Sequence, residues 1–356
     1  MTGMRKKTKI ISVGGEKIGG GERIKIQSMT TTKTADIKNT LLQIAALRQA
    51  GCDIVRVAVA DEADAYAVKV LREQCGLPIV ADIHFSPKLA VLAIENGAHK
   101  VRINPGNIGG EKEIQLVADC IKAHNIPVRV GANTGSIEKG FLKKYGKSAQ
   151  ALVESALYNV GLLEKFGVSD IAISVKASEV PLTVRAYTLL AQKTEYPLHL
   201  GVTEAGTTEA GIVKSAVGIG SLLLNGIGDT VRISLTDDPV REVYAAQQIL
   251  RACGLDEAFV EVVACPTCGR CEWESMSLAN KVAEFVRPYK KKAKLAVMGC
   301  VVNGPGEAKD ADLGIAGGKG VCLLFKKGEV YKKVSAKDAE KEFFKEIALL
   351  LDGEQS

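Results

Sequence analysis

The sequence predicts a (β/α)8, or TIM, barrel followed by a smaller α+β domain, and three observations support this prediction. Residues 24–252 alternate eight short, β-branched apolar runs with eight longer helical patterns. This alternation stops after Leu255, and five of the nine cysteines then follow in the C-terminal stretch. A chain of 356 residues is long enough for both parts. We therefore expect the barrel over residues 1–255 and the second domain over residues 256–356.

Each barrel unit is predicted from its own pattern, in chain order. The strand-like runs begin at Ile24, Asp53, Pro78, His99, Pro127, Asp170, Pro197 and Thr230. The helical patterns that follow them span 36–50, 62–75, 87–96, 111–124, 148–166, 179–193, 209–224 and 239–252. The glycine-rich segment 12–24 precedes the first run and predicts a hairpin, because no helix follows its glycines as a phosphate-binding loop requires.

Composition and charge exclude several classes of protein. The net charge of +6 is too small for this length to indicate a nucleic-acid binder. A hydrophobic content of 46% and a mean hydropathy of +0.08 exclude a disordered chain, and no apolar run reaches the length of a membrane span. The first ten residues do not resemble a secretory signal, so we expect a cytoplasmic protein.

Polar side chains interrupt the predicted barrel strands with a period of two. In the last run, Val231 and Ile233 share one face and leave Arg232 and Ser234 on the other. Because the apolar face must meet the helices, the polar face points into the barrel near the carboxyl ends of the strands. The same parity applies to the other polar strand residues, which are Arg56, Asp82, His84, Arg102, Asn104, Arg129, Asn133, Ser174 and Lys176.

Four arginines and a lysine that converge in one barrel mouth repel each other unless an anion lies among them. Arginine forks match the oxygens of a diphosphate, so the sequence predicts a site for a small diphosphate substrate. The alternative is that each arginine pairs with a local carboxylate, but Asp82 is the clear inward-facing acid on these strands. Glu204, at the end of the seventh run, is either a proton donor or a residue that pairs or caps locally.

The clustered cysteines predict a metal centre in the second domain. Cys265, Cys268 and Cys300 each follow a strand-like run or its loop, with proline and glycine nearby, which is typical of an iron–sulfur ligand loop. A structural zinc site usually has a second CxxC pair, which is absent here. The fourth ligand stays open between Cys271 and Glu307, and a carboxylate in that place would leave one iron exchangeable.

Motifs across the whole chain resemble one enzyme family. They are IQSMTTT, RINPGN, VGANTGS, LHLGVTEAG, GIGDTVRISLT, CPTCGR, GCVVNGPGEA and DLGIAGG. Together they closely resemble the bacterial form of the hydroxymethylbutenyl diphosphate synthase family of the methylerythritol phosphate pathway, and no gap holds the extra domain of the plant type. The resemblance implies an iron–sulfur oxidoreductase of isoprenoid biosynthesis that reductively opens and dehydrates 2-C-methyl-D-erythritol 2,4-cyclodiphosphate.

The resemblance also implies a role for individual residues. It implies a [4Fe–4S] cluster on Cys265, Cys268, Cys300 and Glu307, with Glu204 as the acid for the departing hydroxyl. It implies that the substrate is held by Arg56, His84, Arg102, Asn104, Arg129, Asn133, Lys176, Arg232 and Ser234. The family motif has no cysteine at Cys271, so we expect Glu307 rather than Cys271 to be the fourth ligand.

The resemblance implies reduced flavodoxin or ferredoxin as electron donor and a head-to-tail homodimer. The residues alone leave two other functions open. A redox- or iron-sensing binding protein accounts for the cysteines but leaves the inward arginines unexplained. A pterin-binding barrel with a cluster domain accounts for the fold, but a neutral pterin ring does not need five cations.

Overall fold

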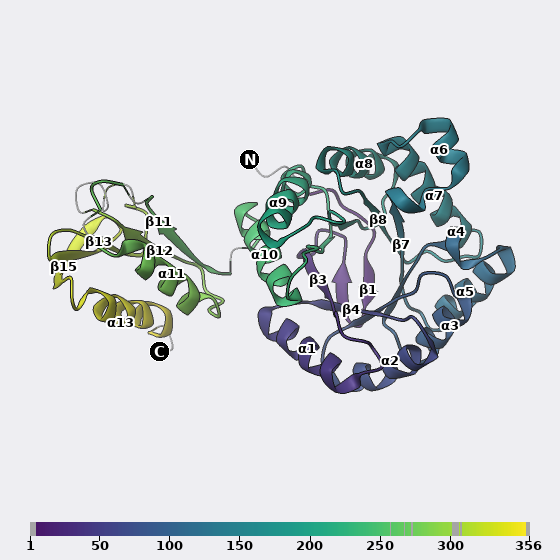
Figure 1. Cartoon of the computed structure of the whole chain (residues 1–356), viewed down its shortest axis with the longest axis horizontal. Helices are drawn as coiled ribbons and strands as arrows, with labels where there is room; N and C mark the ends of the chain where they lie inside the picture. The colour runs from purple at the N-terminus through teal and green to yellow at the C-terminus, as the bar shows by residue number, and fades with distance from the viewer. Residues whose placement is uncertain are drawn as a thin grey trace. The chain divides into compact units, whose positions relative to one another are not determined.

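The chain divides into two compact units, Met1–Leu255 and Asp256–Ser356 (Figure 1). The structure is a computed structural model, which describes residues 5–256, 258–266, 268–271, 273–300, 306 and 308–353. Among these residues, no helix has both the length and the apolar character needed to cross a membrane.

The first unit is a barrel of eight parallel strands, in agreement with the predicted (β/α)8 fold. The strands are β3 (Lys25–Met29), β4 (Ile54–Ala58), β5 (Ile79–Asp82), β6 (Lys100–Ile103), β7 (Val128–Asn133), β8 (Ile171–Lys176), β9 (His199–Leu200) and β10 (Thr230–Val231). They follow the order β8-β7-β6-β5-β4-β3-β10-β9, and a parallel bridge between Ile173 and Leu198 brings the two ends of the sheet together.

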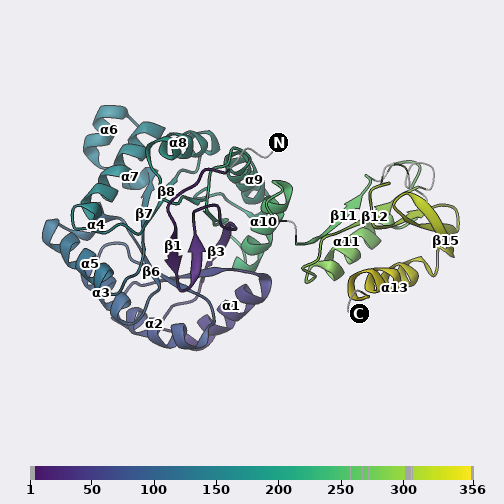
Figure 2. The same ribbon diagram turned by 180° about the vertical axis from the view of Figure 1, so that it is seen from behind.

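An outer ring of helices surrounds the strands, as both ribbon views show (Figures 1 and 2). The long helices are α1 (Ile37–Ala50), α2 (Glu62–Gln74), α3 (Pro87–Glu95), α5 (Glu111–Ala123), α7 (Ala149–Glu164), α8 (Val180–Lys193), α9 (Thr208–Leu224) and α10 (Pro239–Ala252). Two short helices, α4 (Pro105–Ile108) and α6 (Lys139–Tyr145), and a 3-10 turn (Thr134–Ser136) were not predicted. They lie in the connections after β6 and β7 and have at most seven residues each, which is too short to show a helical period.

Sequence signals explain where several helices begin. Asp36, Asp61, Ser86 and Ser148 each precede a helix and accept a hydrogen bond from the backbone N–H three residues later. Strands β9 and β10 are shorter than their apolar runs. After β10, the Leu235 backbone N–H is donated to a side chain, the carboxylate of Glu242, rather than to a neighbouring strand.

The predicted hairpin closes the lower end of the barrel. Strands β1 (Ile11–Val13) and β2 (Glu16–Ile18) pair antiparallel through a turn at Gly14 and Gly15, both with positive φ. Ile11, Val13 and Ile18 are buried against the inward-facing Ile54, Val80 and Ala172 of the barrel strands. This apolar plug leaves the upper mouth as the open end of the barrel.

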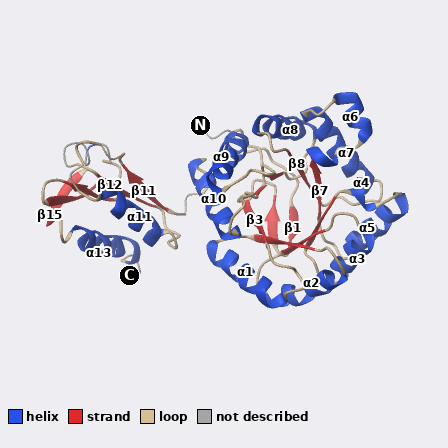
Figure 3. Cartoon of the chain, in the orientation of Figure 1, coloured by secondary structure: helices blue, strands red, loops and turns tan. Residues whose placement is uncertain are grey.

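The second unit is an α+β domain with a five-stranded mixed sheet (Figure 3). Its strands, in sheet order, are β11 (Val260–Ala264), β12 (Ala293–Met298), β13 (Leu313–Gly317), β14 (Val321–Lys326) and β15 (Glu329–Ser335). Helices α11 (Ser275–Val286) and α13 (Ala339–Asp352) pack their apolar residues into the same core as the sheet. Cys322, predicted to be a core residue, is completely buried there.

Candidate active site

The polar strand faces converge on one cavity of about 290 Å³ at the barrel mouth. Eight of the nine residues predicted to bind substrate line it: Arg56, His84, Arg102, Arg129, Asn133, Lys176, Arg232 and Ser234. Met29, Asp82, Ser174, Val202 and Thr203 complete its wall. Asn104 does not line this cavity. It precedes α4, and both atoms of its side-chain amide are buried without a hydrogen-bond partner in the described structure.

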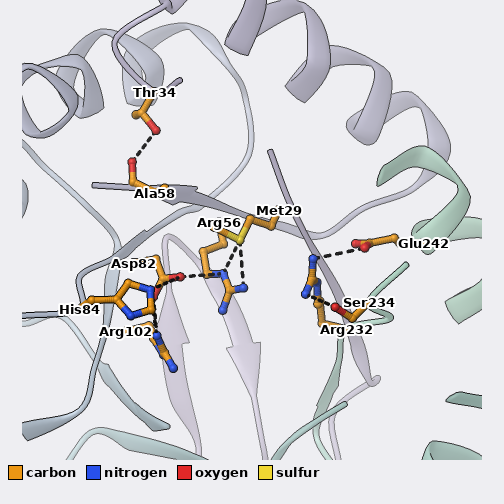
Figure 4. A network of polar contacts seen from close by, with 10 residues as sticks. All are labelled: Met29, Thr34, Arg56, Ala58, Asp82, His84, Arg102, Arg232, Ser234 and Glu242. Atoms are coloured by element: carbon orange, nitrogen blue, oxygen red, sulfur yellow. Dashed lines mark hydrogen bonds and ion pairs between the residues drawn. The ribbon is translucent and has the colours of Figure 1, made fainter. Parts of the chain in front are cut away.

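Asp82 joins two of the arginines at the centre of the site (Figure 4). Its Oδ1 accepts a hydrogen bond from Arg102 Nη1 at 3.0 Å, and its Oδ2 lies 3.6 Å from Arg56 Nε. Burial alone would raise the pKa of Asp82, but Arg56, the hydrogen bond from His84 and Arg102 outweigh burial and hold that pKa well below its usual range. Asp82 is therefore a fixed negative charge that orients two guanidinium groups.

A second acid, Glu242, holds Arg232 and was not found from the sequence. Its Oε1 lies 3.2 Å from Arg232 Nη2, while Arg232 Nη1 donates to Ser234 Oγ at 2.7 Å (Figure 4). Glu242 is on α10 rather than on a strand, so the alternation of inward and outward strand residues could not predict its position. One sequence signal could have indicated a buried, partnered acid: Glu242 lies on the apolar face of a helix, next to Val243 and one turn before Ala246.

Arg129 and Lys176 have no acidic partner. Neither forms an ion pair or hydrogen bond with another residue of the described structure, and two guanidinium nitrogens of Arg129 are buried without a partner. Burial, reinforced by the neighbouring arginines, lowers the pKa of both groups well below their ordinary values. The carboxylate alternative thus holds for Arg56, Arg102 and Arg232 but not for these two cations.

The charges therefore balance only when an anion enters the cavity. Five cations face two acids among the residues described around this mouth. Five cations minus two acids leave three excess positive charges. Because an unpaired charge away from water is costly, a ligand with about three negative charges would balance the site. The planar forks of Arg129 and its neighbours suit phosphate oxygens in particular.

Glu204 and His199 differ sharply in exposure. Glu204 is exposed between β9 and α9, next to the cavity residue Thr203, and has a φ of 51°. Such left-handed backbone is strained for a residue with a side chain and persists mainly where the surroundings or a function require it. His199 is buried and bonded to Thr230 Oγ1 at 2.7 Å, and burial together with Arg129 lowers its pKa well below the ordinary value. It is a packed, neutral histidine.

Two of the three predicted thiol ligands, Cys265 and Cys300, lie at the same end of the second sheet. Cys265 follows β11 and Cys300 follows β12, and these two strands are parallel neighbours. The Gly299 backbone N–H donates to Cys265 Sγ at 3.0 Å. Cys268 is exposed, and hydrogen bonds from Arg270 lower the pKa of its thiol, which favours the thiolate that binds metal. Glu307 lies outside the described residues.

Cys271, which is not one of the three predicted thiol ligands, also lies beside Gly299. A Cβ atom on Gly299 would be 3.1 Å from Cys271 Sγ and 3.3 Å from Cys265 Sγ, so only glycine fits between them without a shift. Cys271 Sγ already has contacts at 3.2 Å with Trp273 O and Ser275 Oγ. No group of three His, Cys, Asp or Glu side chains is arranged around one metal position within the described part of the chain.

These features define a class: a TIM-barrel protein with a cationic barrel mouth and a separate α+β domain that carries a cluster of cysteines. The chain belongs to the GcpE family. The GcpE TIM-barrel domain matches residues 8–247, and the GcpE protein C-terminal domain matches residues 261–349.

Relatives are similar over nearly their whole length. The 4-hydroxy-3-methylbut-2-en-1-yl diphosphate synthase (flavodoxin) of Caldanaerobacter subterraneus subsp. tengcongensis is 54% identical, over 99% of this chain and 100% of the relative. The protein of the same name from Fusobacterium nucleatum is 51% identical, over 97% and 98%. Among solved structures, the dihydropteroate synthase of Yersinia pestis covers 68% of this chain and 97% of its own, with a TM-score of 0.51 and 11% identity, which shows the fold alone.

Proposed function

We propose that this chain catalyses the reaction for which its relatives are named. The chain converts 2-C-methyl-D-erythritol 2,4-cyclodiphosphate to (E)-4-hydroxy-3-methylbut-2-en-1-yl diphosphate, in isoprenoid precursor biosynthesis. Two electrons and two protons enter, the ring C–O bond to phosphate and one C–O bond to hydroxyl break, and one water leaves. The observation that carries the proposal is the pair of cations without an acidic partner, the buried Arg129 and the half-buried Lys176, in a cavity that already holds three paired arginines.

The barrel residues bind and orient the substrate in this proposal. Arg129 and Lys176 take the diphosphate oxygens, because they have no competing carboxylate. Arg56, Arg102 and Arg232 are held in place by Asp82 and Glu242, which fix the positions of their guanidinium groups before substrate arrives. Fixed donors of this kind supply orientation without reorganisation during the reaction. Asn133, Ser234 and His84 complete the set of polar groups in the cavity. Asn104 does not line the cavity, and its proposed role in substrate binding is supported only by its buried amide without a partner in the described structure.

Glu204 is the proposed proton donor to the departing hydroxyl. Two features support this role: Glu204 directly follows the cavity residue Thr203 in the chain, and it is exposed with a left-handed backbone. A Glu204→Gln substitution removes the proton but keeps the shape. We expect this variant to bind substrate normally and to lose turnover, whereas a role in helix capping alone would leave turnover intact.

The cysteines would hold the redox cofactor. The thiols of Cys265, Cys268 and Cys300 suit a [4Fe–4S] cluster. Cys265 and Cys300 follow the parallel neighbours β11 and β12, and Cys265 and Cys268 receive hydrogen bonds of the kind that tune such centres. We propose Glu307 as the fourth ligand. When bound, the cluster would supply electrons singly from reduced flavodoxin or ferredoxin, both carriers of the cytoplasm.

Turnover under anaerobic conditions tests the proposal. Protein with a filled cluster is incubated with the cyclodiphosphate and reduced flavodoxin, and the product is identified by mass spectrometry. We expect the linear hydroxymethylbutenyl diphosphate. An intact cluster spectrum with substrate binding but no product would favour the binding-protein alternative instead.

We further propose that two chains pair head to tail, with the cluster domain of one serving the barrel of the other. Mixing two inactive variants tests this pairing. Glu204→Gln removes the proposed proton donor of the barrel, and Cys300→Ser removes a proposed ligand of the cluster domain. In a mixed dimer one site combines an intact barrel with an intact cluster domain, so we expect activity to return. Sites built within single chains would give no recovery.

A further inference from the structure

An apolar pocket of about 320 Å³ shares two wall residues, Asp82 and His84, with the cationic cavity. The rest of its lining comes from the loops that follow β4 and β5 and from the first turn of α3: Ala58, Val59, Ala60, Ile83, Phe85, Ser86 and Leu89. The close-up shows Ala58 on the strand beside Arg56 and Asp82 (Figure 4). The two spaces are therefore adjacent, with Asp82 and His84 between them.

The polar groups that border this pocket already have partners. The Ala60 backbone N–H donates to Asp64 Oδ2 at 3.1 Å, and Ser86 Oγ accepts from the Leu89 N–H at 3.2 Å. Asp82 directs its oxygens at Arg56 and Arg102. A ligand group in this pocket would consequently find hydrocarbon and few free hydrogen-bonding atoms, which favours an apolar group.

Phe85 makes the open side of the pocket unusually apolar. Its side chain is 71% exposed, next to His84, whose ring lies 5.8 Å away between centroids. A large exposed aromatic residue beside a ligand cavity is typical of a binding surface.

We infer that this pocket binds the hydrocarbon tail of linear prenyl diphosphates whose diphosphate occupies the cationic cavity. The inference rests on the proposed function for the diphosphate half of the site. The substrate is a compact ring that fits one cavity, whereas a prenyl diphosphate longer than five carbons has a charged end and an extended apolar end. Such molecules compete with the substrate, so later products of the same biosynthesis inhibit this step.

Calorimetric titration of the full-length protein tests the inference with three probes: inorganic diphosphate, dimethylallyl diphosphate and geranyl diphosphate. Geranyl diphosphate adds five carbons to the same charged group. Because each buried methylene contributes to affinity, we expect it to bind at least about tenfold more tightly than dimethylallyl diphosphate. In turnover assays it should raise the apparent KM for the cyclodiphosphate and leave kcat unchanged.

Two variants separate the halves of the site. Ala60→Leu fills the pocket from an exposed position, so the fold is retained, and it should abolish the advantage of geranyl diphosphate while inorganic diphosphate binds as before. Arg102→Ala should weaken all three probes. Equal affinity for the two prenyl diphosphates overturns the apolar site and leaves the cationic cavity intact. Failure of all three probes to bind contradicts both the cavity assignment and this inference.

Discussion

Replacement of Arg129 by methionine should strengthen the fold and weaken the function of the barrel. Arg129 is only 1% exposed, has no acidic partner in the described structure and lies within reach of the positive charges of Arg56 and Arg102. Methionine has a similar length and no charge to desolvate. Since apolar replacement of buried charge commonly stabilises a protein, we expect the free energy of unfolding to rise by about 1–4 kcal/mol.

Ligand affinity should change in the opposite direction. A hydrogen bond to a charged group contributes about 1.5–3 kcal/mol, so inorganic diphosphate should bind roughly 10- to 150-fold more weakly to the Arg129→Met variant. Thermal unfolding measures both effects: the midpoint without ligand should rise, and the further increase on adding diphosphate should shrink. Lys88→Met is the matched control, because Lys88 pairs with Glu62 on the surface and contributes little.

One outcome would refute the proposed role of Arg129 in ligand binding. A destabilised Arg129→Met variant with unchanged diphosphate affinity would mean that Arg129 is a structural residue whose partner is a protein group. The cavity would then lose one of its two unpaired cations, and the charge argument for a diphosphate ligand would fail.

Three further predictions concern single residues. Arg232→Ala should weaken substrate binding about tenfold or more, by loss of a charged contact, and leave the visible cluster spectrum intact; loss of that spectrum would contradict separate roles for the two units. Cys271→Ser should retain the cluster and Glu307→Ala should lose it, as read from iron content; the reverse outcome would make Cys271 the fourth ligand. Burial, reinforced by Arg129, lowers the pKa of Lys100 to about 7 in the folded protein, which is below its value in the unfolded chain. Between pH 7 and pH 10 the unfolded chain therefore binds more protons than the folded protein, and the free energy of unfolding rises with pH. Urea titrations should show this slope in the wild type and a flatter one in Lys100→Met; equal slopes would mean that Lys100 stays charged.

The sequence predicted most of the barrel and its mouth because both follow from strand alternation. In a strand covered on both faces, a residue such as Arg232 can point only inward or outward, and the apolar neighbours Val231 and Ile233 decide which. The same argument located Lys176 and Arg129. It required no knowledge of distances, since a closed barrel brings all inward faces together.

Contacts between separate helices, strands and loops could not be predicted from the sequence. Glu242 reaches Arg232 from a helix, and nothing in the local pattern says which strand residue a helical acid will meet. Asn104 has the inward parity of Arg102, yet it lies where β6 has already ended and α4 begins, so strand alternation no longer fixes its direction. The position of Cys271 beside Cys265 depends on the turn between them, which spacing alone does not determine.

The number of electrons consumed for each product molecule tests the proposed reaction most directly. Anaerobic protein with substrate in excess is titrated with a calibrated reductant, and the linear diphosphate is quantified at each addition. We expect two electrons to be consumed for each molecule of linear diphosphate formed, and no linear diphosphate without reductant. Consumption of the cyclodiphosphate without reductant, to a product at the oxidation level of the substrate, would contradict this expectation, because the cationic barrel would then carry out a redox-neutral elimination for which the cysteine domain is not needed.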